Sequence, residues 1–177
     1  MSLDNLTDAE LLVLGLVAEM PRHGYELEQV IEERGMREWT QIGFSSIYFV
    51  LGKLEKAGLV ASGVPASKKA KKVFSITQRG RQALIAGALA ALKSVRPTYS
   101  SASLGIVHWP ILPREAAFEA LEARGHSIAL EIERLERIRY QRQPLPDFVE
   151  ALFDFSTGQM EAEAAWIART LDYMKAK

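Results

Sequence analysis

The amino-acid sequence predicts a mainly α-helical protein with one small β-hairpin. Three observations predict this class. Residues 6–59 contain three segments with apolar side chains at helical spacing. Two short, β-branched segments follow in residues 58–77, on either side of a lysine-rich turn. Residues 113–177 then carry apolar side chains in a pattern typical of two long helices.

Composition limits the class of protein further. The chain has 177 residues, 48% of them hydrophobic, which is enough to bury a core. It contains no cysteine, so disulfides, thiolate metal sites and cysteine nucleophiles are excluded. The start of the chain is polar and acidic, and no apolar run approaches the ~20 residues of a membrane span. We therefore expect a cytoplasmic protein that is neither exported nor inserted in a membrane.

The first two predicted helices have recognisable ends. In "LTDAELLVLGLVAEM" the Thr7 hydroxyl can accept a hydrogen bond from the Glu10 amide while the Glu10 side chain returns to the Thr7 amide, which is a capping box. In "HGYELEQVIEERG" apolar residues recur at helical spacing, and Gly35 suits a left-handed C-terminal cap.

The third predicted helix lies in "SSIYFVLGKLEKAGL". Ile47, Leu51 and Leu54 fall on one face at spacings i, i+4 and i+7, and Ser45 or Ser46 can serve as the N-cap. The opposite face carries two aromatic residues and two lysines: Tyr48, Phe49, Lys53 and Lys56.

Positive charge is concentrated in and after this helix. The whole chain has a formal net charge of zero, yet residues 40–81 hold eight basic residues and one acid, Glu55. Half of the eight lie in the turn between "GLVASGV" and "KVFSIT": Lys68, Lys69, Lys71 and Lys72. Three helices followed by a hairpin with a basic tip are the outline of a winged helix-turn-helix, in which the third helix enters the major groove and positive groups contact phosphates.

Three stretches of this region resemble the PadR family of bacterial transcriptional regulators: "HGYEL", "SSIYFVLGKLEKAGLV" and "KVFSITQRGRQAL". The resemblance covers residues 6–84 in motifs and extends over the remainder by length and helical layout. It implies a homodimer whose winged helices bind a palindromic operator and whose C-terminal helices dimerise. The family pattern often has proline where this chain has Phe49, and tyrosine where it has Phe74.

These patterns together give a set of candidate DNA contacts. We expect the third helix to contact base edges through Ser45, Ser46, Phe49 and Lys53. Tyr48 and the four lysines of the hairpin turn, called the wing lysines (Lys68, Lys69, Lys71 and Lys72), are expected to hold phosphates. Lys56 lies on the same outer face. The structural alternatives are that the lysines form a solvated turn, that Tyr48 only packs, and that the two serines are only helix caps.

The rest of the chain predicts a helical second domain. Thr77 caps a helix predicted over residues 78–96, which leads out of the hairpin. We therefore assign residues 1–96 to the winged helix-turn-helix. Residues 97–112 form a linker, with a short helix near 101–108. Residues 113–177 form a dimerisation domain of two long helices, the first with Leu121, Ile128 and Leu135 at every seventh position.

The last helix carries an apolar stripe too long for a small winged helix to bury. We expect it to pack on the preceding helix and on a second subunit through Leu152, Phe155, Trp166, Ile167, Leu171 and Met174. An intramolecular antiparallel pair is the alternative, and it would bury only part of the stripe.

The family resemblance also implies release from DNA by small aromatic compounds. Tyr99, Trp109 and Trp166 are the candidate effector-lining residues, although aromatic residues at helical spacing more often belong to a core.

No catalytic, metal or cofactor site is indicated. The three histidines are far apart, and no nucleophile elbow, phosphate-binding glycine loop or dinucleotide fingerprint occurs. The sequence therefore favours a homodimeric, operator-binding repressor over an enzyme. Two alternatives stay open: a helical protein-interaction adaptor, and a small-molecule-binding protein with no role on DNA.

Overall fold

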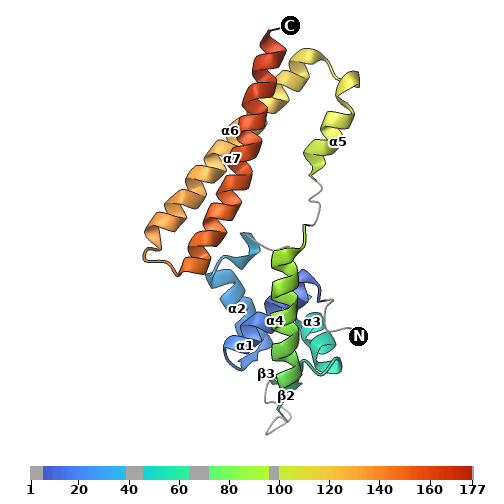
Figure 1. Cartoon of the computed structure of the whole chain (residues 1–177), viewed down its shortest axis with the longest axis vertical. Coiled ribbons are helices and arrows are strands. Elements are labelled where there is room, and N and C mark those ends of the chain that lie inside the picture. Colours follow the sequence, from blue (N-terminus) through green and yellow to red (C-terminus); the bar gives the residue numbers. More distant parts are fainter. Residues whose placement is uncertain (1–5, 39–45, 64–71, 96–99, 177) are drawn as a thin grey trace. The chain divides into compact units, whose positions relative to one another are not determined.

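A computed structural model describes residues 6–38, 46–63, 72–95 and 100–176 (Figure 1). The chain divides into two compact units, Met1–Pro97 and Thr98–Lys177. Within the described residues, no helix combines the length and the apolar character needed to cross a bilayer. The predicted fold class, mainly helical with a small β-sheet, is confirmed.

The first unit contains four α-helices, a 3₁₀ turn and a small sheet in its described part. The helices are α1 (Asp8–Glu19), α2 (Gly24–Glu33), η1 (Met36–Glu38), α3 (Ser46–Lys56) and α4 (Gln78–Lys93). The strands are β1 (Arg22–His23), β2 (Val60–Ser62) and β3 (Val73–Ile76), and they pair antiparallel in the order β1-β3-β2.

The helix ends follow the predicted capping chemistry. Thr7 and Glu10 form the capping box of α1, with the Thr7 amide donating to Glu10 Oε2 at 2.8 Å and the Glu10 amide donating to Thr7 Oγ1 at 3.3 Å. Gly35 follows α2 with a φ of 64°, so it has the left-handed conformation that glycine adopts without strain. Thr77 caps α4 by accepting from the Gly80 amide at 2.9 Å.

The sequence did not predict strand β1. It pairs with β3 in the register Arg22 to Phe74 and His23 to Val73, whereas β2 pairs with the other edge of β3. A two-residue strand has no periodicity, and its pairing depends on a segment about fifty positions away, so local sequence carries no signal for it.

The core of the first unit lies between α1, α2 and α3. Side chains from all three helices are almost completely buried, and the sheet closes the cluster with Val60 and Phe74. The largest fully buried side chains of these helices are Leu14, Leu27, Ile31, Ile47, Leu51 and Leu54. Each contributes about 1.5–3 kcal/mol of hydrophobic stabilisation, before the cost of ordering the chain is subtracted.

The start of α4 lies against the end of the α3–β2 connection. The Thr77 amide donates to the Leu59 carbonyl at 3.0 Å, and the Thr77 hydroxyl donates to the Gly58 carbonyl at 2.8 Å. This approach leaves no room at Gly80, where an added Cβ would lie 2.0 Å from the Leu59 carbonyl oxygen. Glycine at this position is therefore required by packing rather than by backbone conformation.

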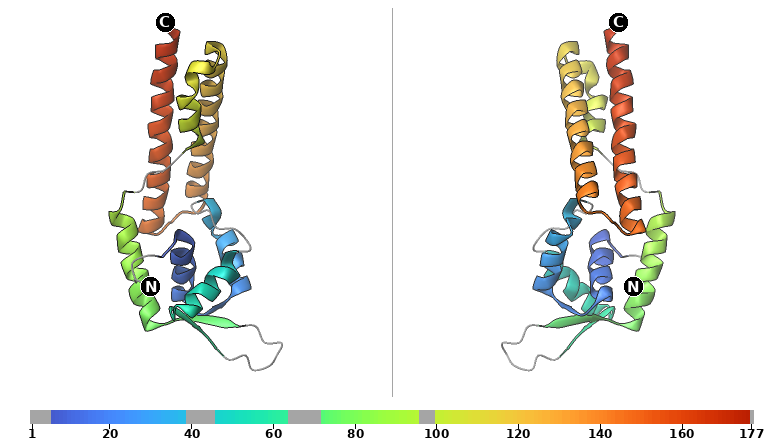
Figure 2. Two further views of the ribbon diagram at one scale, coloured as in Figure 1. Left: turned by 90° about the vertical axis from the view of Figure 1, so that its right-hand side faces the viewer. Right: turned by 90° about the vertical axis from the view of Figure 1, so that its left-hand side faces the viewer.

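All regular elements in the described residues of the second unit are helices. It contains α5 (Ser101–Val107), the 3₁₀ turn η2 (Trp109–Ile111), α6 (Arg114–Gln141) and α7 (Asp147–Lys175). The short helix expected near residues 101–108 is thus present, and together with η2 it belongs to this unit. Both views of Figure 2 show α6 and α7 running alongside each other.

Polar contacts show that α6 and α7 are antiparallel. Arg114, at the start of α6, donates to the carbonyl of Met174 at the end of α7. Arg124 Nε lies 2.5 Å from Glu163 Oε1, and Arg139, near the end of α6, lies 2.6 Å from Glu150 Oε2. Between these contacts the two helices bury an apolar seam made of Ala117, Leu135, Phe153, Ile167 and Met174.

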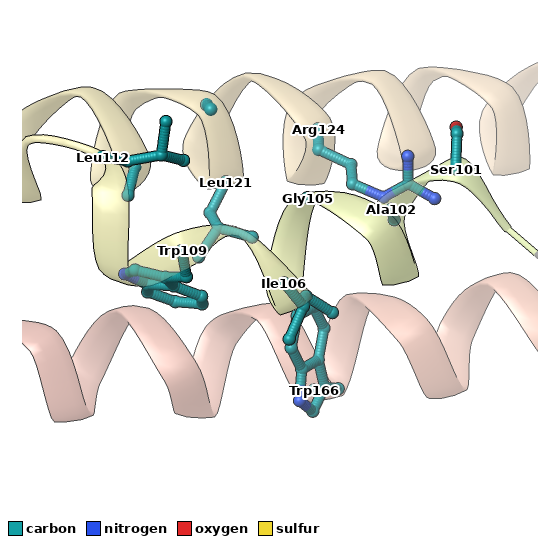
Figure 3. A pocket seen from close by; sticks show the side chains of 11 residues that line it. Ser101, Ala102, Gly105, Ile106, Trp109, Leu112, Leu121, Arg124 and Trp166 are labelled. Atoms are coloured by element: carbon teal, nitrogen blue, oxygen red, sulfur yellow. The ribbon is translucent and has the colours of Figure 1, made fainter.

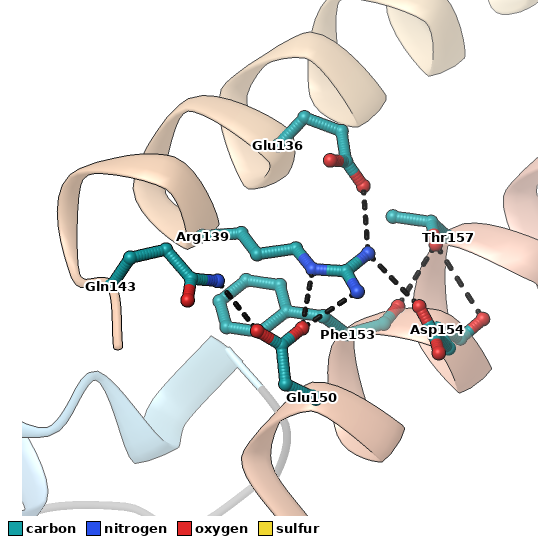
Figure 4. A network of polar contacts seen from close by, with 7 residues as sticks. All are labelled: Glu136, Arg139, Gln143, Glu150, Phe153, Asp154 and Thr157. Carbon is teal, nitrogen blue, oxygen red and sulfur yellow. Dashed lines mark hydrogen bonds and ion pairs between the residues drawn. The ribbon is translucent and has the colours of Figure 1, made fainter. Parts of the chain in front are cut away.

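A polar network fixes the end of the pair where α6 turns into α7 (Figure 4). Arg139 contacts Glu150 and also Asp154 Oδ1, the latter at 2.9 Å, and both acids lie in the first two turns of α7. Gln143 Nε2 donates to Glu150 Oε1 at 2.5 Å. This hydrogen bond, with a smaller contribution from Arg139, holds the pKa of Glu150 below its usual range. The turn is therefore closed by charge-assisted contacts around Glu150.

We predict that Gly80→Ala lowers the free energy of unfolding of the first unit by about 3 kcal/mol, because the new methyl group meets a main-chain oxygen that cannot move aside. Gly52→Ala is the matched control, since Gly52 lies within α3 with nothing within 4 Å of its Cβ position. It should raise the stability by about 0.5–1 kcal/mol. Urea unfolding of both variants measures these changes, and an equal effect of the two would contradict the packing account.

Candidate nucleic-acid interface

Helix α3 has one buried face and one exposed face. Ile47, Leu51 and Leu54 point into the core and are at most 1% exposed. On the outer side, Tyr48 is 59% exposed and Phe49 is 69% exposed. Two large rings exposed next to each other form an apolar patch, and such patches are typical of contact surfaces. Lys56 is exposed in the last turn of the same helix.

The ring of Tyr48 lies against the N-terminus of α2. A Cβ added at Gly24 would lie 2.5 Å from Tyr48 Cε1, so a larger residue at position 24 would displace the ring. Beside it is a surface hollow of about 410 Å³, lined by His23, Gly24, Tyr25, Tyr48, Lys72 and Phe74. Helix α3, the start of α2 and the base of the β2–β3 hairpin therefore meet at Tyr48.

The base of the hairpin is held by contacts to both neighbouring elements. His23 Nδ1 lies 2.9 Å from the carbonyl oxygen of Lys72, within hydrogen-bond distance. Lys72 Nζ lies 3.6 Å from Glu55 Oε2 of α3, and Ser62 of β2 donates to the other Glu55 oxygen. The bond from Ser62, assisted by Lys72, lowers the pKa of Glu55. Lys72, the described lysine of the hairpin turn, thus lies within ion-pair distance of α3 and remains exposed.

Lys53 makes a contact that the sequence did not predict. Its ammonium lies 2.7 Å from Glu10 Oε1 on α1, and also 5.8 Å from the centroid of the Phe49 ring. Glu10 is only 2% exposed. Burial by itself would raise the pKa of Glu10, but the hydrogen bonds from Lys53 and Thr7 outweigh burial and lower it. Glu10 therefore carries its negative charge inside the unit at neutral pH.

Both of these acids depart from the sequence pattern around them. Glu10 precedes Val13, Leu14 and Val17 at spacings i+3, i+4 and i+7, which places its side chain on the buried face of α1. Glu55 is the only acid in residues 40–81. These two signals could have identified Glu10 and Glu55, which are ion-pair partners of lysines in the structure.

The remaining candidate DNA contacts are only partly described. Ser45, Lys68, Lys69 and Lys71 lie outside the described residues, and Ser46 begins α3. Within the described part of the chain, no three histidine or acidic side chains gather where they could hold a metal ion.

The candidate effector residues lie in the second unit. Trp109 and Trp166 line a hollow of about 300 Å³ between α5, α6 and α7, and Tyr99 lies outside the described residues. Figure 3 shows Ile106, Trp109 and Leu121 around this space. The other lining side chains are mostly small or aliphatic, and Arg124 in its wall is paired with Glu163. The hollow is therefore apolar and bounded by aromatic rings.

The candidate dimerisation residues fall into two groups. Ile167 and Met174 are buried between α6 and α7, so they stabilise the helix pair within one chain. Leu152 is 37% exposed and Phe155 is 66% exposed, whereas Trp166 and Leu171 are half-buried. Exposed apolar residues elsewhere on α6 and α7 add to the second group: Leu130, Phe148 and Tyr173.

Part of the first unit matches the model of a known protein family. Residues 13–86 match the transcriptional regulator PadR-like family. This segment, which lies within the first unit, is similar to PadR-like transcriptional regulators and has the winged-helix fold predicted from its motifs. No curated protein sequence matches the chain.

Solved structures of PadR proteins share the fold over almost the whole chain. Bacillus subtilis PadR in complex with operator DNA matches with a TM-score of 0.71 and 19% identity, over 93% of this chain and 98% of that one. The same protein in complex with p-coumaric acid matches with a TM-score of 0.75 and 19% identity, over 94% and 98%. A PadR-like regulator from Bacillus cereus matches with a TM-score of 0.66 and 19% identity, over 96% of this chain and 99% of that one. At this identity the likeness establishes the fold alone.

Proposed function

We propose that this PadR-like regulator represses transcription by binding a palindromic operator as a homodimer, with α3 of each subunit in the major groove. The observation that carries the proposal is the outer face of α3, where Tyr48 and Phe49 are exposed beside the hairpin that bears the lysine-rich turn. A helix with its opposite face buried can present these side chains to a groove without unfolding.

The proposed contacts divide by chemistry. Phe49, with the serines at the start of α3, faces base edges, where an apolar ring can meet a thymine methyl group. Tyr48, Lys56, Lys68, Lys69, Lys71 and Lys72 hold phosphates. The N-terminus of α3 adds the positive end of the helix dipole to the same surface. No catalytic role is assigned to any residue.

The homodimer is proposed to form through the C-terminal helices. Phe155 and Leu152 of α7 remain accessible after α6 and α7 have packed, and they supply the apolar surface that association requires. Bacillus subtilis PadR, which shares this fold, was solved with operator DNA, and this supports the proposed partner. Two folded subunits would then bind two half-sites related by symmetry.

The hollow beside Trp109 and Trp166 is the proposed effector site. Its size suits a small aromatic molecule, and its walls offer stacking surfaces with little competing polarity. The complex of Bacillus subtilis PadR with p-coumaric acid supports the class of ligand. A ligand that binds better to the state released from DNA would lower operator affinity.

Replacing Lys68, Lys69, Lys71 and Lys72 together with alanine should weaken binding to all duplex sequences about equally. The slope of log affinity against log salt should become shallower by about 0.9 for each phosphate that the variant no longer neutralises. Fluorescence anisotropy with random and selected duplexes between about 50 and 200 mM salt measures both effects.

The control changes the same amount of charge in the second unit: Arg137, Arg142, Arg169 and Lys175 to alanine. It should retain the wild-type slope. A loss of sequence preference without a change in slope in the wing variant would contradict the assigned phosphate contacts, and weak, unselective binding by the wild type would favour the adaptor alternative.

Filling the hollow should remove the response to aromatic ligands. Ala120 lines it from α6, so Ala120→Trp should leave DNA binding intact but make it insensitive to a panel of small aromatic compounds that includes p-coumaric acid. Ala129→Trp is the control, since Ala129 is exposed on α6 and does not line the hollow. Wild-type operator affinity that stays constant across the whole panel would count against the effector site.

A further inference from the structure

An ion pair between the buried Glu10 carboxylate and the partly exposed Lys53 joins the first turn of α1 to α3. Glu10 Oε1 lies 2.7 Å from the Lys53 ammonium, while Glu10 Oε2 accepts from the Thr7 amide at 2.8 Å and from the Thr7 hydroxyl at 3.0 Å. Both carboxylate oxygens are therefore satisfied. Because Glu10 is 2% exposed, its carboxylate depends mainly on these protein partners for its hydrogen bonds.

This pairing restricts what Lys53 can do. Its side chain is 44% exposed, but its charged end is directed at α1 and is hydrogen-bonded to Glu10. A lysine that moves its ammonium to a DNA phosphate would leave the Glu10 carboxylate buried without a counter-charge. Removing the counter-charge of a buried carboxylate is unfavourable, so contact with DNA through Lys53 is disfavoured.

The pair also gives α3 a directional contact, which its apolar packing does not provide. Hydrophobic burial of Ile47, Leu51 and Leu54 is non-directional and tolerates small rotations of the helix about its axis. A hydrogen-bonded ion pair has a defined distance and direction, and it lies near the C-terminal end of α3. Small rotations would displace Tyr48 and Phe49 from the bases and phosphates that they face.

We propose that Glu10 and Lys53 are positioning residues that set the orientation of α3, and through it the sequence selectivity of the regulator, without contacting DNA themselves. The inference rests on the proposed operator binding. It changes the role expected of Lys53 from base contact to internal anchor, and it gives Glu10 a role in DNA recognition.

A double-mutant cycle tests the pair. Glu10→Gln, Lys53→Met and the double variant are measured in the full-length protein, against the duplex that the wild type selects from a random pool and against a scrambled duplex, between about 50 and 200 mM salt. Each single variant should show about a tenfold smaller preference for the selected duplex, and the double variant should be no worse than either single variant. The salt slope should stay at the wild-type value, because every phosphate contact is retained.

Lys56→Met provides the matched lysine, since Lys56 is exposed one turn further along α3. It should weaken binding to both duplexes alike and make the slope of log affinity against log salt shallower by about 0.9. If Glu10→Gln fails to fold by circular dichroism, Glu10→Asp takes its place, because it keeps the charge but shortens the reach to Lys53. The expected result is again a reduced preference with an unchanged slope.

Three outcomes would overturn the inference. A shallower salt slope for Lys53→Met alone would make Lys53 a direct phosphate contact. Variants that unfold at lower temperature yet keep the full preference would make the pair only structural. A wild type with no preferred duplex would overturn operator binding and this inference together, which separates failure of the proposed function from failure of the pair.

Discussion

Burial of Ile47, Leu51 and Leu54 against α1 is the interaction on which the rest of the DNA-binding unit depends. With these three side chains inside, the helical period leaves Tyr48 and Phe49 outside, and no rotation of α3 can bury both sets. The C-terminal end of the same helix then leads through Gly58, which has a φ of 69°, into β2. The orientation of α3 thus determines both the exposed rings and the direction of the wing.

Polar contacts add direction to this apolar framework. Lys53 connects α3 to α1, Glu55 connects it to the hairpin, and Thr77 connects the hairpin to α4. Each contact joins two elements at the surface of the core, where burial alone leaves orientation loosely defined. In the second unit, the ion pairs of Arg124 with Glu163 and of Arg139 with Glu150 likewise join α6 to α7 beside their apolar seam.

Local chemistry made much of this fold predictable. The capping box at Thr7, the cap at Thr77 and the left-handed Gly35 are set by neighbours within four residues, so the sequence contains all the partners. Strand β1 and the Glu10–Lys53 pair join positions far apart in the chain, and no periodic pattern specifies them. The same limit applies to α7. Its apolar stripe predicted burial, but only the structure shows that α6 covers Ile167 and leaves Phe155 exposed.

Selection from a pool of random duplexes, with the dimer state checked by light scattering, tests the central claim that two α3 helices bind a symmetric operator. We predict enrichment of an inverted repeat whose half-sites lie about one helical turn apart, about 10–10.5 bp between centres. A folded, dimeric protein that enriches no motif at near-physiological salt would contradict it.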